Sequence, residues 1–307
     1  MRPRIRPHLR RAGRLGLFPY LSRLVRSYSR FAPPAKHIKI DDEEEQLDDD
    51  ISSSWRAAIR SRRAMNLLLL GLLAFLFLLF LIGYTIYKPP HLLVRFLQWK
   101  YPAVLFHVPL PSSHRVMALT LDDAPSRETG RILDVLKTYG AKATFFVIGA
   151  HAEAYPELVQ RIHDEGHEVG NHMWRDEPTI KIPFDELRPQ LAKVESLLPS
   201  NGQGAKYFRP GSGIFSSKMV RAAASMGYKT VLGNIFPFDP QVPIPWINSW
   251  HVLSMARPGG IIILHENRPW SVDQLDLVLK GLTATGWKVE SVGGLLKSAK
   301  KLQTKAA

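Results

Sequence analysis

The longest apolar stretch of the chain covers residues 65–87, where leucine and phenylalanine dominate and no charged residue occurs. About twenty helical residues at roughly 1.5 Å each match the hydrocarbon core of a bilayer. The stretch begins too late for a cleavable secretory signal, which lies within about the first 30 residues. We therefore predict a transmembrane anchor at residues 65–87, with a buried core helix as the alternative. Pro89 and Pro90 end this helix, and residues 88–114 are expected to form a stem.

From residue 115 to about residue 300, short apolar runs alternate with segments of helical periodicity. One such segment places Ile132, Val135, Leu136 and Tyr139 at i, i+3, i+4 and i+7. Strands that alternate with helices of this length predict βαβ units and a parallel sheet, either a barrel or a doubly wound sheet. The predicted strands are Val116–Leu121, Ala143–Ile148, His167–Gly170, Lys206–Phe208, Lys229–Gly233, Ile261–Leu264 and Trp287–Val292.

The net charge of +14 is spread unevenly along the 307 residues. Residues 1–64 contain 15 Lys and Arg against 8 Asp and Glu, so half of the positive excess lies in about a fifth of the chain. Within this segment the basic residues come first and the acidic run Asp41–Asp50 follows. Segregated like charges rarely pack, so we predict a disordered N-terminal arm at residues 1–64. Because the basic residues are mainly in this arm, a nucleic-acid partner is disfavoured.

The basic arm also orients the predicted anchor. Positive residues favour the cytosolic side of a membrane, so we expect a single-pass signal-anchor protein with a cytosolic N-terminus. Its C-terminal domain would then be lumenal or extracellular. The alternative is a mitochondrial presequence, because residues 1–30 lack acids and residues 26–29 resemble a matrix-protease site. The absence of cysteine excludes a disulfide framework, thiolate zinc sites and cysteine catalysis.

Two loops of the predicted α/β domain carry side chains that suit a metal site. Asp122 and Asp123 follow the first strand, where one carboxylate can bind a metal and the other can act as a base. Adjacent Asp residues before proline are also ordinary loop and N-cap chemistry. His172 and Asp176 follow the third strand, and one helical turn would place both on the same face. An imidazole with carboxylates suits a divalent cation.

Two further loops carry an arginine and a histidine. Arg209 leaves the fourth strand into a glycine-rich turn, where it could hold a carboxylate and expose backbone N–H groups. The alternative is a surface arginine beside a flexible turn. His265 follows four apolar strand residues and is well placed to donate a proton, although a histidine at a strand end is more often structural.

The order of these motifs resembles the polysaccharide deacetylase family, the NodB-homology domain of carbohydrate esterase family 4. The motifs are Thr-Leu-Asp-Asp, Gly-His-Glu-Val-Gly-Asn-His, Phe-Arg-Pro and Ile-Leu-His-Glu, and the resemblance covers about residues 115–297. It implies an α/β fold, a distorted (β/α)7 barrel, for the catalytic domain at residues 115–300. It also implies a hydrolase that removes N-acetyl groups from an N-acetylglucosamine-containing glycan such as chitin.

The resemblance implies one divalent metal, with zinc expected and cobalt or manganese as alternatives. By position, Asp123 and His172 would be metal ligands, and Asp176 stands where the family has a second histidine. The extra negative charge should favour harder ions such as manganese. By the same comparison Asp122 would be the general base that activates water.

Further roles are implied for residues around the base. Arg209 would orient Asp122, His265 would be the general acid, and Leu264 would line the pocket for the acetyl methyl group. Gly211 and Ser212 stand where the family has an aromatic wall. The expected substrate-binding residues are Leu264, Pro210, Gly211, Ser212 and Asp239, the last being near the family's fourth motif.

Three functions remain open at this point. The first is a membrane-anchored deacetylase of an N-acetylated glycan, with the carbohydrate as its partner and the membrane held through residues 65–87. The second is a deacetylase or deformylase of a lipid-linked sugar or small amide, which the anchor and the missing aromatic wall both favour. The third is a non-catalytic sugar-binding descendant, in which Asp176 has ended metal binding.

Overall fold

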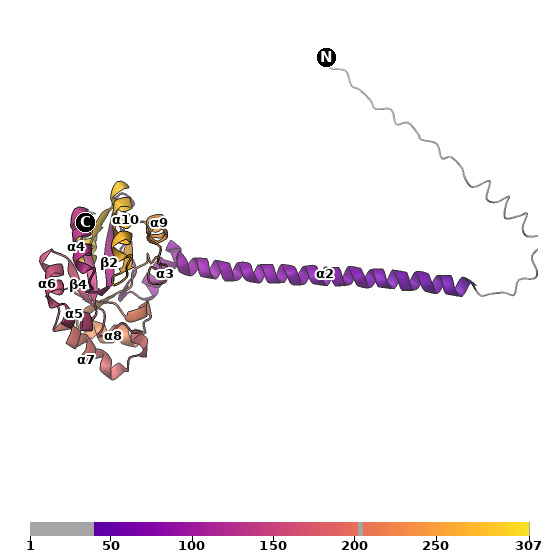
Figure 1. Ribbon diagram of the computed structural model, residues 1–307, viewed down its shortest axis with the longest axis horizontal. Helices are drawn as coiled ribbons and strands as arrows, with labels where there is room; N and C mark the ends of the chain where they lie inside the picture. The colour runs from indigo at the N-terminus through magenta and orange to yellow at the C-terminus, as the bar shows by residue number, and fades with distance from the viewer. Residues whose placement is uncertain (1–39, 202–204, 307) are drawn as a thin grey trace, which may run out of the picture. The chain divides into compact units, whose positions relative to one another are not determined.

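A computed structural model describes residues 40–201 and 205–306 of the chain. The described residues divide into two units at Leu76, and the two units are described separately (Figure 1). Residues 1–39, the basic part of the arm predicted to be disordered, lie outside the described residues.

The first described element is a single helix of 48 residues, α2 (Ile40–Tyr87). Its apolar part is long and apolar enough to cross a membrane, and its side chains are exposed. Residues 40–64 are also helical, so the prediction of disorder is wrong for this segment. Forming the first turn is the costly step, so a helix formed in the apolar stretch extends at low cost into residues 55–64, which contain alanine and arginine.

The second unit is built on a parallel sheet with the strand order β1-β6-β5-β4-β3-β2-β7, and β8 also pairs with β2. All seven predicted strands are present, which confirms the α/β prediction. After β6, Ile235 bridges to Ile262 of β7, so the sheet curls toward closure. The curled parallel sheet with surrounding helices fits a distorted (β/α)7 barrel. The strands are β1 (Val104–Leu105), β2 (Val116–Ala124), β3 (Ala143–Val147), β4 (Glu168–Asn171), β5 (Lys206–Phe208), β6 (Tyr228–Val231), β7 (Ile261–His265) and β8 (Lys288–Glu290).

Helices follow the strands and cover the sheet (Figure 1). Helix α10 packs against α9 and α4, and α11 packs against β2. The helices are α3 (His91–Lys100), α4 (Thr129–Thr138), α5 (Gly149–Ala154), α6 (Pro156–Asp164), α7 (Phe184–Glu195), α8 (Ser217–Ser225), α9 (Pro245–Met255), α10 (Ser271–Ala284) and α11 (Val292–Ala306), with 3-10 turns η1 (Thr179–Lys181) and η3 (Gly211–Gly213).

The core is continuous through this part of the sheet because β2 pairs with β3, β7 and β8 and is buried along its length. The burial pattern of β2 has no exposed position. The first six residues of β2 are apolar except for Thr120, as expected for a strand in a sheet that is covered on both faces. The largest core cluster joins β2 and β3 to the inner faces of α4 and α10, through residues such as Leu119, Phe145, Leu136 and Leu279.

Residues 88–114, expected to form a stem, are part of the folded unit. Strand β1 pairs in parallel with β6, through Val104 with Thr230 and Leu105 with Val231. Val94 of α3 packs with Val104 and Phe106 in a buried cluster. The two-residue strand is too short to give a recognisable alternation, which is why the sequence pattern did not identify it.

Candidate active site

The sequence-predicted side chains come together at the carboxyl ends of the strands. Asp122 and Asp123 end β2, His172 follows β4, Arg209 follows β5, and His265 ends β7. In the sheet Asp122 is the register partner of His265, which fixes these two residues side by side. Parallel strands deliver their carboxyl ends to one edge, so residues far apart in sequence share one cavity.

Asp122 is buried and receives a hydrogen bond from Nη1 of Arg209 on its Oδ1 atom. Its other oxygen, Oδ2, lies 3.8 Å from Nε2 of His172 and 3.9 Å from Nε2 of His265. Burial alone would raise the pKa of Asp122, but Arg209, His172 and His265 outweigh it and hold this pKa below its ordinary value. Asp122 is therefore an ionised carboxylate between two imidazoles.

Arg209 is fixed by three different elements. Its Nη1 also donates to Oγ1 of Thr120 at 2.8 Å, and its Nε donates to the carbonyl of Val231 at 3.0 Å. The guanidinium lies over the ring of Phe146, 4.1 Å from the ring centroid. The side chain therefore has little freedom, and Asp122 is held in one orientation.

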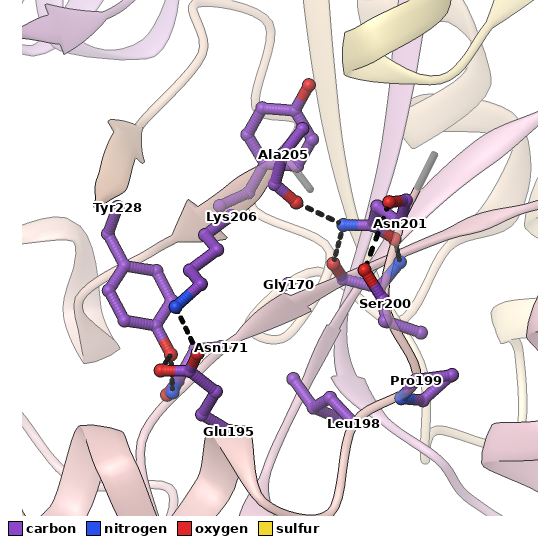
Figure 2. A pocket seen from close by; sticks show the side chains of 12 residues that line it. Gly170, Asn171, Glu195, Leu198, Pro199, Ser200, Asn201, Ala205, Lys206 and Tyr228 are labelled. Atoms are coloured by element: carbon purple, nitrogen blue, oxygen red, sulfur yellow. Dashed lines mark hydrogen bonds and ion pairs between the residues drawn. The ribbon is translucent and has the colours of Figure 1, made fainter. Parts of the chain in front are cut away.

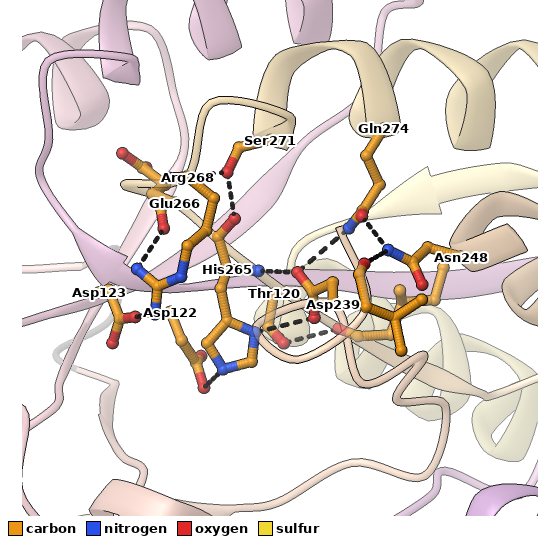
Figure 3. A network of polar contacts seen from close by, with 12 residues as sticks. Thr120, Asp122, Asp123, Asp239, Asn248, His265, Glu266, Arg268, Ser271 and Gln274 are labelled. Atoms are coloured by element: carbon orange, nitrogen blue, oxygen red, sulfur yellow. Dashed lines mark hydrogen bonds and ion pairs between the residues drawn. The ribbon is translucent and has the colours of Figure 1, made fainter. Parts of the chain in front are cut away.

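His265 is oriented by Asp239, a buried carboxylate in the segment between β6 and α9. Nδ1 of His265 donates to Oδ1 of Asp239 at 3.0 Å, and the backbone N–H of His265 donates to Oδ2 at 2.8 Å (Figure 3). Nε2 of Gln274 holds the same Oδ2 at 3.1 Å. Burial lowers the pKa of His265, but the hydrogen bond and charge of Asp239, with the charges of Asp122 and Asp123, raise it to about 9.

Asp123 and His172 form the part of the site that suits a cation. Nδ1 of His172 donates to the carbonyl of Arg209 at 2.8 Å, which leaves the Nε2 lone pair facing Oδ1 of Asp123 at 3.8 Å. Asp123 has a left-handed backbone with φ of 66°, and its carbonyl accepts from Nδ1 of His151 at 2.9 Å. Burial raises the pKa of Asp123.

Asp176 does not share a helical turn with His172, so that expectation is wrong. Residues 172–176 form irregular bends after β4, and Asp176 is exposed. It still lines the same cavity as Asp123 and His172. Met173 has a left-handed backbone with φ of 70°, which is incompatible with a helical turn, and the following segment packs against Gly211 through Glu177.

Asp123 and His172 fit a divalent metal as two of its ligands. Metal–nitrogen and metal–oxygen bonds of roughly 2 Å can bridge their separation, and a histidine fixed through its other nitrogen to a carbonyl is the usual arrangement. Among the described residues, no three His, Asp or Glu side chains are close enough together to enclose an ion. Asp176 is therefore a third ligand only if its segment moves inward.

The cavity above these residues has a volume of about 380 Å³. Pro210 and Ser212 line it as expected, whereas Gly211 does not. A Cβ atom on Gly211 would lie 2.2 Å from the carbonyl oxygen of Glu177, so the close approach of these two segments requires glycine. The departure from the family pattern at Gly211 therefore has a packing reason.

Two predicted substrate-binding residues lie elsewhere. Leu264 belongs to the main core cluster, and Ile263 lines the cavity in its place. Successive strand residues point to opposite faces, so Leu264 cannot share the cavity with Ile263 and His265. Asp239 is buried beneath His265 and does not line the cavity.

Three residues of the site region were not identified from the sequence. Phe236 lines the cavity, with its ring centroid 5.6 Å from that of His265, and supplies an aromatic wall from the segment that also carries Asp239. Nη2 of Arg268 lies 3.3 Å from Oδ2 of Asp123. Glu266 is buried and accepts from Oγ of Ser126 at 2.9 Å, and burial raises its pKa to about 7. Glu266 had a signal as the last residue of the Ile-Leu-His-Glu motif, although no role was assigned to it, and Arg268 lies three residues after His265 in the sequence.

A second cavity, of about 180 Å³, lies between β4, β5 and the end of α7 (Figure 2). Its polar groups are paired with one another: the hydroxyl of Tyr228 donates to Glu195 at 3.1 Å, and Nδ2 of Asn201 donates to the carbonyl of Val169 at 2.7 Å. None of the predicted site residues lines it. These contacts stabilise the sheet edge and present no reactive constellation.

Comparison with known proteins agrees with the motif order. A family model described as polysaccharide deacetylase matches residues 110–231. The peptidoglycan-N-acetylglucosamine deacetylase of Bacillus cereus is 32% identical over 197 residues, which cover 62% of this chain and 72% of that protein. The crystal structure of the Bc1960 peptidoglycan N-acetylglucosamine deacetylase matches with a TM-score of 0.59 and 31% identity, over 64% of this chain and 95% of the other.

A non-catalytic protein is also similar in structure. BA3943 of Bacillus anthracis, described as a CE4 family pseudoenzyme, matches with a TM-score of 0.57 and 28% identity, over 64% of this chain and 69% of the other. The same fold therefore supports both named deacetylases and a named pseudoenzyme.

Proposed function

The chain belongs to the polysaccharide deacetylase family, and from this premise we propose that it is a metal-dependent hydrolase that removes N-acetyl groups from an amino-sugar glycan. The observation that carries the proposal is the position of one carboxylate oxygen of Asp122, between the Nε2 atoms of His172 and His265. Named relatives act on peptidoglycan, and chitin has the same N-acetyl chemistry.

The proposed roles follow from the geometry. Asp122, ionised and held by Arg209, accepts the proton of the attacking water as its oxygen bonds to the acetyl carbon. A divalent metal held by Asp123 and His172 would polarise the acetyl carbonyl and make the water more acidic.

His265, whose pKa of about 9 keeps it protonated near neutral pH, donates a proton to the sugar nitrogen as the carbon–nitrogen bond breaks. The products are acetate and the free amino sugar. Pro210, Ser212 and Phe236 line the cavity beside these groups and would contact the sugar ring. In this scheme Asp239 positions His265 and does not touch the substrate.

We further propose that the apolar part of α2 spans a membrane, with a cytosolic N-terminus and a lumenal or extracellular catalytic domain. The length and exposed apolar surface of the helix support the span, and the basic N-terminal segment supports the orientation. The catalytic domain then begins with α3, because β1 belongs to the sheet and α3 packs on β1 through Val94.

The test is acetate release by the full chain in bilayer nanodiscs, measured with N-acetylglucosamine oligomers, peptidoglycan fragments and a lipid-linked N-acetylated sugar. Bound zinc, cobalt and manganese are quantified on the same samples. Acetate release that is lost with a chelator and restored by one metal would support the proposal, with His172→Ala as the metal-deficient control. Metal binding without acetate release from any of these substrates would contradict it.

A second candidate function, a non-catalytic sugar-binding protein, is favoured by the contact between Arg268 and Asp123. A guanidinium at 3.3 Å already pairs with the carboxylate that a metal needs, and Asp176 is exposed. This function predicts glycan binding with no metal uptake, and it predicts that Asp176→His would restore metal binding. If the chain binds the glycan and also holds one equivalent of metal, this function is excluded.

A further inference from the structure

Helix α9 has a partly polar buried side and two exposed tryptophans. Its buried side includes Asn248, Ser249 and His251, whereas Trp246 and Trp250 are 67% and 57% exposed. The buried amide of Asn248 is paired, because its Nδ2 donates to the carbonyl of Val242 and to Oε1 of Gln274, both at 2.7 Å. Two neighbouring tryptophans exposed on one helix form an apolar surface of the kind that marks an interaction site.

Helix α3 carries a similar exposed apolar stripe. Leu92, Phe96 and Trp99 are 77%, 49% and 77% exposed, and their spacing of four and three residues places them on one helix face. The opposite side of α3 holds Val94, which is buried against the sheet. Arg95 and Lys100 border the stripe, and Nζ of Lys100 lies 5.8 Å from the ring centroid of Phe96.

Both helices meet the end of α2. The ring of Tyr87 packs on His251 of α9 with centroids 4.3 Å apart, and α3 begins at His91 (Figure 1). Nζ of Lys88 donates to Oγ of Ser254 at 2.7 Å and lies 3.9 Å from the ring centroid of Trp250. The exposed aromatic residues are therefore continuous with the end of the apolar helix.

The charge of this region has one sign. Residues 77–121 and 240–265 contain no Asp or Glu. A cavity of about 770 Å³ opens between α3 and the segment after α9, and Lys88, Arg95 and Arg257 line it together with His91 and His107. Cations next to exposed tryptophans are the combination found where proteins contact the headgroups of anionic lipids.

We propose that the surface formed by Leu92, Phe96 and Trp99 of α3 and Trp246 and Trp250 of α9 is a membrane-docking face, which lies on a bilayer containing anionic lipids. The aromatic rings enter the interfacial region, and Lys88, Arg95 and Arg257 pair with lipid phosphates. This inference rests on the proposed span of α2, and it does not depend on the hydrolase activity.

Docking would keep the candidate active site close to the bilayer. Ring contacts lead from Tyr87 to Phe238 at 5.8 Å, from Phe238 to Phe236 at 4.5 Å, and from Phe236 to His265 at 5.6 Å. The wall of the cavity is thus linked by packed side chains to the end of the span. Glycans carried at the membrane surface, such as lipid-linked ones, are the substrates that this placement favours.

The experiment exploits the absence of native cysteine. Spin labels are attached to the full chain in nanodiscs at Phe96→Cys and Trp246→Cys on the face, and at Phe184→Cys on α7 as the matched control, since Phe184 is 40% exposed. Leu73→Cys reports on the span itself. Accessibility to dissolved oxygen and to a water-soluble nickel chelate separates lipid from water.

We expect the labels at Phe96 and Trp246 to behave like the label at Leu73 in anionic bilayers, and the label at Phe184 to be water-accessible. Adding Arg95→Gln should lower the docked-to-undocked ratio about fivefold, because one basic residue near an anionic surface contributes roughly that factor. Labels at Phe96 and Trp246 as water-accessible as Phe184, with Leu73 in lipid, would overturn the docking face. Water access at Leu73 would overturn the span and the docking face together, and leave the acetate-release test unaffected.

Discussion

Replacing Asp239 with asparagine tests how the protein keeps His265 protonated. The change removes one buried negative charge and preserves the size of the side chain. Burial lowers the pKa of His265, and the hydrogen bond and charge of Asp239 are the largest effects that raise it to about 9. In Asp239→Asn we expect this pKa to return to its ordinary value of about 6.5 or below. A fall of about 2.5 in pKa corresponds to about 3 kcal/mol.

Activity should change with pH in a defined direction. At pH ~7.5, the protonated fraction of His265 would drop from nearly all molecules to roughly a tenth. Acetate release at that pH should therefore fall about tenfold or more, and the remaining activity should move to lower pH. The assay combines the pH profile of acetate release with an NMR titration of the His265 ring in labelled protein.

Stability gives an independent readout. Because the folded-state pKa of His265 lies above its unfolded value, the stabilisation is fully present below pH ~6.5 and is lost as the pH rises through about 9. Asp239→Asn should remove this part of the pH dependence of the unfolding free energy. Asp273→Asn, the same chemical change at an exposed position of α10, is the control. A His265 pKa that stays near 9 in Asp239→Asn would refute the reasoning.

Three further predictions follow from other contacts. Asp122→Asn should keep bound metal and lose about 10²–10⁴-fold of the turnover, measured by acetate release with metal analysis, and full activity would contradict the base assignment. Burial raises the pKa of Glu266 to about 7 and makes its ionisation costly in the fold, so Glu266→Gln should lessen the loss of stability as the pH rises from ~4.5 to 7. Chemical denaturation at several pH values measures this, and an unchanged slope of unfolding free energy against pH would contradict it. Gly211→Ala should cost about 1–3 kcal/mol of unfolding free energy, because the added methyl group meets the carbonyl of Glu177, and a thermal unfolding curve equal to the parent's would refute this.

The strands could be predicted because their burial leaves a direct trace in the sequence. Every position of β2 is at least half-buried, so the run Val116–Leu121 is apolar except for Thr120. The ends of the strands were predicted less accurately. Strand β2 continues through Asp122 to Ala124, because its pairing with β3 and β7 extends past the apolar residues. Strand β1 was missed because only Val104 and Leu105 pair, and its place at the sheet edge depends on β6.

The candidate site could be predicted where a strand fixes the side chain. Asp122 and His265 are register partners, so knowing the two strands is nearly enough to bring them together. Asp239 reaches His265 from the segment between β6 and α9, a loop whose path has no periodic signal. Phe236 supplies the aromatic wall from the same segment, so the missing aromatic after Arg209 does not leave the cavity without one.

The pairing of Arg268 with Asp123 changes how the substitution at Asp176 is understood. Asp176 adds a negative charge where the family pattern has a neutral imidazole, and Arg268 brings a positive charge 3.3 Å from Oδ2 of Asp123. Asp176 and Arg268 line the same cavity, so their opposite charges cancel there. Arg268 cannot replace the missing imidazole as a ligand, because a guanidinium has no lone pair to offer a metal. Arg268 contacts Oδ2 of Asp123, whereas Oδ1 faces Nε2 of His172, so a cation between Oδ1 and Nε2 would leave the pairing of Arg268 with Oδ2 intact.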